Sequence, residues 1–292
     1  MKDSFMNWVL FVVLSLIWGS SFLLMKIGME SLAPYEVAAL RILSAGVVLI
    51  PFCLKAFNEI PSNKIAIVFL SGLIGNFFPA FLFCLAETKL NSSLTGMINS
   101  LTPLCTVVIG ILFFKMMAGL QKLIGVLIGL AGLFFLVSPN GQLHFENFNY
   151  ISLVLLATVM YAVTVNMVSR HMVGIGSINI ASAAFVMLIP ACLAVLLATG
   201  YFYKPLGQMA FIKSTVASCT LGIAGTAFAT VLFYRLVKRA GALFGSMVTY
   251  GIPFIAAGWG IFYGETVTLF QIGCLGIILS GVYLVNKKPK SI

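Results

Sequence analysis

The stretch SSLTGMINSLTPLCTVVIGILFF, residues 92–114, is an apolar run with four interrupting residues near its centre, Asn99, Ser100, Thr102 and Pro103. As a helix rising 1.5 Å per residue, a run of this length spans the roughly 30 Å hydrocarbon core of a bilayer. Hydrocarbon cannot satisfy free backbone groups, so a mid-span proline is tolerated where it faces protein or a watery cavity. The stretch therefore predicts a transmembrane helix whose broken middle faces the interior of a helix bundle.

Similar apolar runs fill nearly the whole chain. The 292 residues are 61% hydrophobic and 8% charged, with a mean hydropathy of +1.11, whereas a soluble domain has about 25% charged residues. We therefore predict an all-α integral membrane protein without a separate soluble domain. The first run lacks a signal-peptide cleavage site, so we expect it to be retained. The ten expected transmembrane helices lie at about residues 6–27, 34–54, 65–86, 92–114, 120–138, 148–170, 177–200, 213–236, 241–263 and 269–286.

The net charge of +10 is explained by where the basic residues lie. With the N-terminus in the cytoplasm, twelve Lys and Arg residues fall in cytoplasmic segments and four fall outside, namely Lys26, Lys89, Lys204 and Lys213. This imbalance is the positive-inside pattern of membrane proteins. We therefore expect both termini in the cytoplasm, a location in the cell (inner) membrane, and the lipid bilayer rather than a nucleic acid as the partner.

The residue types that build metal and catalytic sites are scattered. All six cysteines lie inside apolar runs without a CxxC pair, and His144 and His171 fall in loops predicted on opposite sides of the membrane. Buried cysteines of this kind behave as small hydrophobic residues. The sequence has no HExxH, phosphate-binding loop or nucleophile-elbow motif. We expect no metal, no cofactor and no enzymatic activity.

The chain repeats itself with an offset of 150 residues. Between positions 72 and 115 this shift aligns nine identical residues, among them Gly72 with Gly222, where roughly three would match by chance. Each repeat would contain five helices, and an odd number gives the second repeat the opposite orientation. We therefore predict two inverted repeats, residues 1–140 and 141–292, in one structural unit, as in many secondary transporters. The alternative is a duplication that only stabilises a bundle.

Pro103 and Pro253 occupy the same position in the two repeats. Proline cannot donate a backbone hydrogen bond and its ring collides with the carbonyl four residues earlier, so each helix should kink there and face inward. Polar residues around both kinks either contact a substrate in a central cavity or only satisfy backbone and neighbouring helices. We favour the cavity. The candidate substrate-binding residues are Trp18, Ser21, Asn76, Asn99, Ser100, Thr102, Tyr161, Thr164, Thr226, Ser246, Thr249, Tyr250 and Trp259.

Charged residues within the spans are few. Arg41 lies inside the second predicted helix, and an intramembrane charge is costly and usually functional. It either pairs with Glu36 or Glu265 at an outer gate or binds an anionic substrate group such as a carboxylate, and the sequence leaves both interpretations open. Glu36, Glu87 and Glu265 lie near helix ends, where we expect solvated carboxylates rather than a proton relay. The residues expected to break helices or gate the cavity are Pro103, Pro253, Arg41, Glu36 and Glu265.

Several glycines are spaced for close helix packing. Small residues four positions apart let two helix backbones approach each other. We expect these residues to pack helices rather than to bind a ligand. The GxxxG pairs are Gly125 with Gly129, Gly241 with Gly245, and Gly260 with Gly264.

Three stretches carry a family resemblance. They are LSLIWGSSFLLMKIGMESLAPYEVAALRILSAG (residues 14–46), residues 92–114 followed by LIGVLIGLAGLFFLV, and GALFGSMVTYGIPFIAAGWGIFYGETVTLFQIGCLGIILSGVYLV (residues 241–285). Together they resemble the EamA family of the drug/metabolite transporter superfamily across essentially the whole chain. The resemblance implies ten helices in two inverted five-helix repeats, and export or exchange of small metabolites or drugs through a central cavity. One departure is that Glu265 stands where the family often has a glutamate, while the first repeat has Lys115, Met116 and Met117.

We expect the protein to export a small neutral or zwitterionic metabolite, including amino-acid-like molecules, by alternating access, and to function as a monomer. Facilitative uptake or exchange is the alternative within transport, because a symmetric cavity has no intrinsic direction. A membrane scaffold or receptor is the alternative from another class, although the loops are too short to offer much binding surface.

Overall fold

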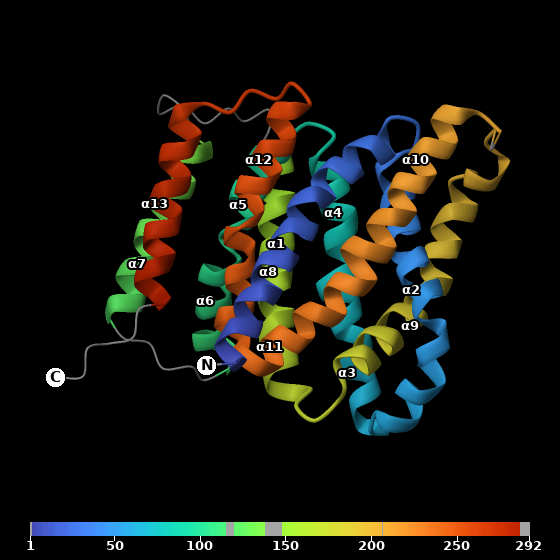
Figure 1. Ribbon diagram of the computed structural model, residues 1–292, viewed down its shortest axis with the longest axis horizontal. Coiled ribbons are helices and arrows are strands. Elements are labelled where there is room, and N and C mark those ends of the chain that lie inside the picture. The colour runs from blue at the N-terminus through green and yellow to red at the C-terminus, as the bar shows by residue number, and fades with distance from the viewer. Residues whose placement is uncertain (1, 115–119, 138–147, 206, 287–292) are drawn as a thin grey trace.

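The computed structural model describes residues 2–114, 120–137, 148–205 and 207–286, and every regular element in these ranges is a helix. The predicted repeat boundary at residues 140 and 141, and the departure at residues 115–117, lie outside them. The helices are α1 (Lys2–Met29), α2 (Pro34–Glu59), α3 (Ser62–Gly72), η1 (Leu73–Phe77), α4 (Phe78–Ala86), α5 (Ser92–Asn99), α6 (Thr102–Phe114), α7 (Leu120–Val137), α8 (Phe148–His171), α9 (Ser177–Ala198), η4 (Tyr201–Tyr203), α10 (Met209–Thr220), η5 (Leu221–Phe228), α11 (Ala229–Ser246), η6 (Met247–Tyr250), α12 (Ile252–Phe262) and α13 (Leu269–Asn286) (Figure 1).

Seven helical stretches are long and apolar enough to cross a membrane, judged by length and composition among the described residues. Two further apolar helices are shorter than these seven, Ile124–Leu136 and Leu269–Leu284. The last of the seven, Met209–Phe262, runs for 54 residues and includes two of the predicted spans. Gly241 divides it, because its backbone leaves the helical region at φ 87° and ψ 166°, where an L-residue is strained and glycine is not.

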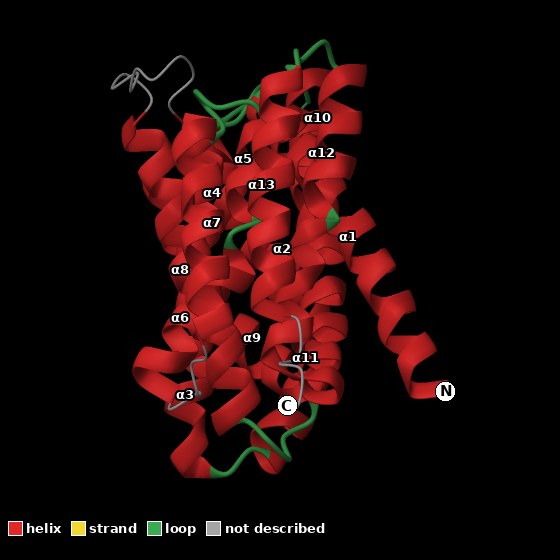
Figure 2. Cartoon of the chain, turned by 90° about the vertical axis from the view of Figure 1, so that its left-hand side faces the viewer, coloured by secondary structure: helices red, strands yellow, loops and turns green. Residues whose placement is uncertain are grey.

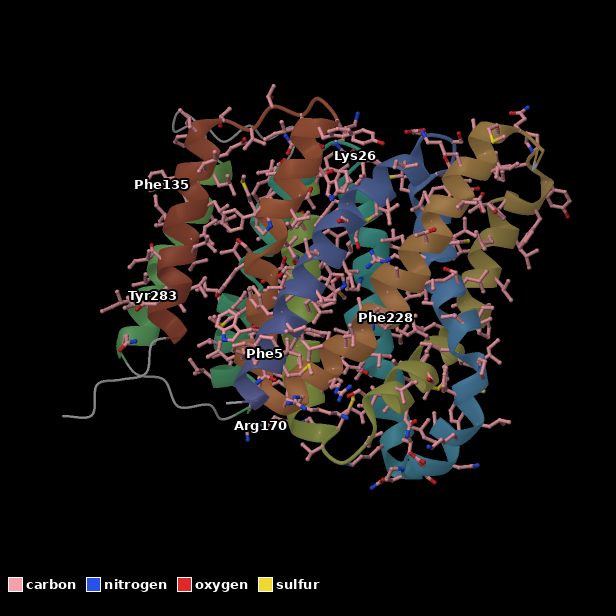
Figure 3. All side chains as sticks on the ribbon, viewed as in Figure 1. Phe5, Lys26, Phe135, Arg170, Phe228 and Tyr283 are labelled. Carbon is pink, nitrogen blue, oxygen red and sulfur yellow. The ribbon has the colours of Figure 1, made fainter. Side chains whose placement is uncertain are left out.

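The helices lie side by side in one bundle, with the first turns of α1 leaning away from it (Figure 2). Large apolar side chains such as Phe5, Phe228 and Tyr283 cover the outer surface and are exposed. Figure 3 shows Lys26 and Arg170 near opposite ends of the bundle. An apolar belt between charged ends is the surface that a lipid bilayer requires.

The helix breaks occur where the prolines predicted them. The helix of the quoted stretch stops at Asn99 and restarts as α6 at Thr102, one residue before Pro103. In the second half, η6 interrupts the helix and α12 restarts at Ile252, one residue before Pro253. The two restarts are therefore 150 residues apart.

Wide helical turns also recur at this offset. The π-helical segment η1 covers Leu73–Phe77, and η5 covers Leu221–Phe228. Such turns are rare and are frequent at functional sites. Each of the two lies where its helix passes the centre of the bundle, beside the cavity described below.

Matched glycines pack against opposite halves of the chain. A Cβ atom on Gly72 would lie 3.0 Å from the Cβ of Ala184 in α9, and one on Gly222 would overlap Ser44 and the carbonyl of Arg41 in α2. Each glycine therefore allows the third helix of its own half to touch the second helix of the other half. Ala184 occupies in one crossing the place that Arg41 occupies in the other.

A second pair of glycines repeats this crossed pattern. A Cβ atom on Gly75 would overlap Thr164 of α8, and one on Gly225 would lie 2.7 Å from the hydroxyl of Ser21 in α1. The first helix of each half is thus packed against the middle of the third helix of the other half. These crossings bring polar residues of both halves to the centre of the bundle.

Candidate functional site

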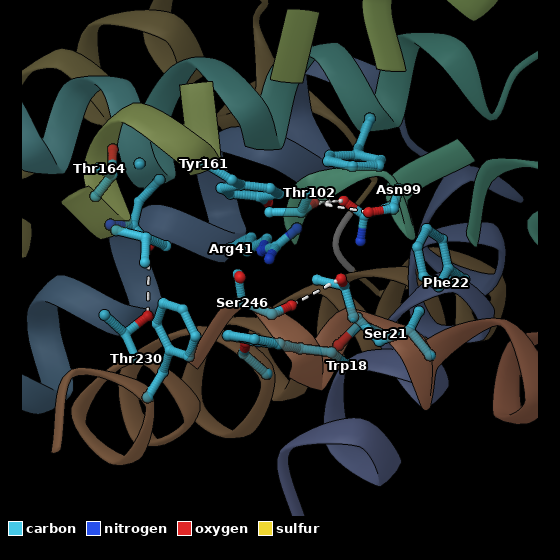
Figure 4. Close-up of a pocket in the computed structure, with 18 of the residues that line it drawn as sticks. Trp18, Ser21, Phe22, Arg41, Asn99, Thr102, Tyr161, Thr164, Thr230 and Ser246 are labelled. Atoms are coloured by element: carbon cyan, nitrogen blue, oxygen red, sulfur yellow. Dashed lines mark hydrogen bonds between the residues drawn. The ribbon is translucent and has the colours of Figure 1, made fainter. Parts of the chain in front are cut away.

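A cavity lies at the centre of the bundle, between helices of both halves of the chain (Figure 4). The space inside it, counted together with its opening to solvent, measures about 790 Å³. Its lining is Trp18, Ser21, Phe22, Met25, Arg41, Gly75, Asn76, Phe83, Asn99, Thr102, Tyr161, Thr164, Val165, Gly225, Thr230, Phe233, Tyr234, Ser246, Thr249 and Ile252.

Most of the candidate substrate-binding residues meet in this lining. Those that do are Trp18, Ser21, Asn76, Asn99, Thr102, Tyr161, Thr164, Ser246 and Thr249, and Arg41 joins them. These positions come from five or more helices far apart in sequence. Their predicted depth along each helix grouped them as one site, and the fold places them around one cavity.

Four candidates lie outside the lining. Ser100 is buried and its hydroxyl donates to the Met97 carbonyl at 2.5 Å, while Thr226 lies behind Arg41 as its hydrogen-bond partner. Trp259 is 38% exposed and its indole N–H donates to the hydroxyl of Ser20 at 2.9 Å. Tyr250 is half-buried on η6 and is not among the lining residues.

The aromatic wall of the cavity combines the predicted Trp18 and Tyr161 with three phenylalanines that were not predicted, Phe22, Phe83 and Phe233. Phe83 stacks on Tyr161 with ring centroids 5.8 Å apart, and Phe233 meets Trp18 edge to face at 4.9 Å. Phenylalanine is common throughout the chain, so its presence alone distinguishes neither cavity nor lipid contact. One signal was available, because Phe83 and Phe233 are a matched pair at the 150-residue offset.

The hydroxyl groups around the breaks bond largely to their own helices. The Thr102 hydroxyl donates to the Asn99 carbonyl at 2.7 Å, so it satisfies the carbonyl that Pro103 releases. The Thr249 hydroxyl likewise donates to a carbonyl three residues earlier, that of Ser246, at 2.9 Å. Each hydroxyl can therefore satisfy a backbone carbonyl and still line the cavity, because its oxygen can also accept a hydrogen bond from the cavity side.

Arg41 is buried, with 8% of its surface exposed, and reaches into the middle of the lining between Tyr161 and Ser246 (Figure 4). Its Nε donates to the Thr226 hydroxyl at 2.7 Å, and its Nη1 lies 3.9 Å from the sulfur of Met25. Among the described residues, no carboxylate lies within ion-pair distance of this guanidinium.

The two acids considered as partners of Arg41 are paired with lysines instead. Glu36 accepts from Lys204 Nζ at 2.6 Å, and Glu265 forms an ion pair with Lys26. The sequence could not foresee these pairings, because they join residues 168 and 239 positions apart. The outer-gate ion pair with Arg41 is thus not formed in this structure.

Glu265 ties three segments together at the end of the bundle where α1 finishes. Besides the ion pair with Lys26, it accepts from the backbone N–H of Ser92 at 3.1 Å and of Ser93 at 3.3 Å. Burial alone would raise the pKa of Glu265, but these hydrogen bonds and the Lys26 charge hold that pKa below its ordinary value. The carboxylate therefore stays ionised and fixes the start of α5 against the loop after α12.

The expectation of solvated carboxylates is wrong for Glu36, which is 1% exposed, and for Glu87, which directly follows α4. Glu87 also lacks a partner among the described residues. It is 6% exposed, and neither of its carboxyl oxygens has a hydrogen-bond partner. Burial raises the pKa of Glu87 well above its ordinary value, against the opposing charges of Lys26 and Arg41. Its helix end packs inside the bundle, a property that sequence position alone does not reveal.

Comparison with known proteins adds an independent observation. The model of the EamA-like transporter family matches residues 6–138 and residues 148–287. The chain belongs to this family. It is 23% identical over 283 residues to Protein PagO of Salmonella typhimurium, covering 94% of this chain and 91% of that protein.

Other relatives carry the word transporter in their names. An uncharacterized inner membrane transporter of Escherichia coli, YedA, is 25% identical over 280 residues, 94% of this chain and 88% of YedA. An uncharacterized transporter of Archaeoglobus fulgidus is 23% identical over 287 residues, 97% and 99% of the two chains. The protein is accordingly a multi-pass membrane transporter of the EamA type, and the family and these names point away from an enzyme.

A solved crystal structure shares the fold. It superimposes with a TM-score of 0.66 over 95% of each chain, at 17% sequence identity. At this identity the likeness concerns the arrangement of helices alone.

Proposed function

We propose that this transporter exports a small metabolite by alternating access through the central cavity, and that the cavity lies between two inverted five-helix repeats, residues 1–140 and 141–292. The observation that carries the proposal is a buried, partly polar cavity lined by helices of both halves. In transporters built from inverted repeats, substrate sites lie at the repeat interface near the midplane.

The crossed glycine contacts support the repeat. Gly72 and Gly75 meet α9 and α8, and Gly222 and Gly225 meet α2 and α1, so each contact has a counterpart with the halves exchanged. The family model matches each half separately, over residues 6–138 and 148–287. The break at Gly241 divides Met209–Phe262 into two spans, which brings the proposed count to ten helices.

The distribution of basic residues supports an orientation with both termini in the cytoplasm. In that orientation the Lys26–Glu265 pair and the Lys204–Glu36 pair lie on the outer side. Both pairs join segments far apart in sequence, so their separation would accompany opening toward the outside. We propose that one chain carries out this cycle in the bilayer, with the small-molecule substrate as its partner.

The first test compares the metabolites released by cells with and without the protein, followed by flux of the enriched compounds into liposomes that contain the purified chain. Export predicts that specific compounds leave cells faster when the protein is present. Faster entry instead would replace export by uptake or exchange. Transport itself is refuted if a well-folded preparation moves no compound above the background of empty liposomes.

The second test addresses alternating access. Cysteines replace Lys26 and Glu265, and a short bis-thiosulfonate cross-linker joins them and is removed again by reductant. Flux should stop on cross-linking and return on reduction. Each single-cysteine variant is the matched control for modification of the six native cysteines, and unimpeded flux through the cross-linked protein would contradict the proposed gate.

A further inference from the structure

Arg41 is the charged side chain of the cavity. Of the lining residues that the structure describes, it is the one that carries a formal charge, and none of them is acidic. Removing a charge from water is unfavourable unless a partner compensates it, and charges inside membrane proteins are paired or serve a substrate. The cavity without substrate therefore has an uncompensated positive charge.

The acidic residues nearest to this region do not compensate it. Glu36 and Glu265 are neutralised by Lys204 and Lys26. Glu87 is outside the cavity lining and beyond ion-pair distance of Arg41, and its burial favours the neutral form. An anion that enters the cavity would thus meet a positive charge without a competing carboxylate.

Packing does not require an arginine at this position. Where Gly222 crosses α2 at Arg41, Gly72 crosses α9 at Ala184 in the same way. An alanine fills the matching place in the other crossing, so the long charged side chain is an addition to the common packing. This asymmetry points to a role in binding rather than in folding.

The guanidinium is held so that its outer edge faces the cavity. Thr226 accepts from Nε at 2.7 Å and fixes the base of the group. Around the rest of the guanidinium lie the Met25 sulfur, a weak acceptor 3.9 Å from Nη1, and the Tyr161 hydroxyl, a neutral hydrogen-bond partner. A guanidinium fork presents parallel N–H groups that match the two oxygens of a carboxylate.

The rest of the lining fits an apolar body. Trp18, Phe22, Phe83 and Phe233 supply aromatic surface in the same lining as Arg41. Asn99 adds an amide to the lining, and no described residue accepts from its N–H₂ group. The lining offers no carboxylate to a substrate ammonium, so a zwitterion would bury one of its two charges unpaired.

We propose that the substrate is a small organic monoanion, a carboxylate that Arg41 binds through its terminal nitrogens and whose apolar body lies against the aromatic wall. The proposal rests on the proposed transport function and names its substrate class as a monocarboxylate, in place of the neutral or zwitterionic metabolite expected from the sequence. Thr226 serves as a positioning residue that holds the guanidinium in place.

The test uses pairs of compounds that differ in the ammonium group. Phenylpyruvate is compared with phenylalanine, and 4-methyl-2-oxopentanoate with leucine, by the shift in thermal unfolding of the purified protein and by quenching of its tryptophan fluorescence. Each keto acid should bind at least about tenfold more tightly than its amino acid, because the amino acid leaves a buried charge unpaired. Equal or tighter binding of the amino acids would overturn the proposal, and so would the absence of binding by both keto acids.

Substitutions test how much Arg41 and Thr226 contribute to phenylpyruvate binding. Arg41→Gln should weaken phenylpyruvate binding about 10- to 100-fold, because it removes hydrogen bonds to a charged group, and Arg41→Lys should fall between because the fork is lost. Thr226→Val should weaken binding about threefold to tenfold and leave the charge in place. Lys213→Gln, an exposed change in the pair with Glu30, is the matched control and should bind like the unmodified protein.

The outcomes separate this proposal from transport in general. If Arg41→Gln does not fold, the comparison of keto and amino acids in the unmodified protein still decides the substrate class. Unchanged phenylpyruvate affinity in a folded Arg41→Gln variant would refute the anion site. If a neutral compound or an amino acid moves through liposomes while the keto acids do not, the monoanion proposal fails and transport stands; if nothing moves, both fail.

Discussion

Replacing Gly281 with alanine should push α13 away from α7. These two helices form a pair at one edge of the bundle (Figure 1). A Cβ atom on Gly281 would lie 2.5 Å from the backbone nitrogen of Gly129 and 2.6 Å from the carbonyl oxygen of Gly125, the predicted GxxxG pair. The obstacles are backbone atoms, so no side-chain rotation relieves them, and reaching ordinary contact requires the helices to separate by roughly 1 Å.

The magnitude follows from two opposing effects. Overpacking costs about 1–3 kcal/mol, and rigid backbone on both sides places this site near the upper end. Alanine in a helix otherwise gains about 0.5–1 kcal/mol over glycine. We therefore expect Gly281→Ala to lower the free energy of unfolding by about 2 kcal/mol.

The matched control lies on the same helix. Gly273 also belongs to α13, and a Cβ atom there would meet nothing within 4 Å. Gly273→Ala should therefore stabilise the protein by about 0.5–1 kcal/mol. Thermal unfolding of both variants in the same detergent, followed by tryptophan fluorescence, measures the difference; the reasoning is refuted if Gly281→Ala melts at or above the temperature of Gly273→Ala.

Three further predictions concern the buried polar groups. Folding raises the pKa of Glu87, so the stability that its neutral carboxyl contributes is present below about its ordinary pKa of 4.5 and is lost as the pH rises toward the folded pKa. The unfolding temperature of Glu87→Gln should therefore match that of the unmodified protein near pH 4 and exceed it increasingly toward pH 8. Unfolding temperatures that change in parallel with pH would contradict this. Glu265→Gln should cost about 1 kcal/mol, because Lys26 is 30% exposed and partly screened, and the loss should shrink in high salt; a salt-independent loss would assign it to the hydrogen bonds from Ser92 and Ser93. Asn99→Ala should reduce flux without changing the unfolding temperature, whereas Trp259→Phe, outside the cavity, should leave flux unchanged; equal flux in both would confine Asn99 to the helix break.

Helix positions followed closely from the sequence. The prediction of a helix over 148–170 agrees with Phe148–His171, and that over 177–200 agrees with Ser177–Ala198. Apolar runs must be helical in hydrocarbon, and their polar flanks mark where each helix can end. The breaks before Pro103 and Pro253 followed equally, because the chemistry of proline acts locally.

Partners across the bundle did not follow from the sequence. The position of a residue along its helix indicates that Arg41 and Glu36 lie at different depths in the membrane. It does not indicate which lysine forms an ion pair with each glutamate. The burial of Glu87 likewise depends on how neighbouring helices cover the end of α4. These properties depend on how each helix is rotated about its axis and where it crosses its neighbours. A helix that is hydrophobic all round has little periodic pattern in its sequence, so the sequence does not indicate its rotation.

The single charge in the cavity has a consequence for energetics. With a carboxylate on Arg41, the loaded cavity lining is electrically neutral, whereas the empty one carries one positive charge. Exporting a monoanion moves negative charge outward, and an inside-negative membrane potential supplies about 2.3 kcal/mol per 100 mV for each charge that crosses. The resting electric field of the cell would then drive export by itself, and the turnover of the carrier would be measurable as a current.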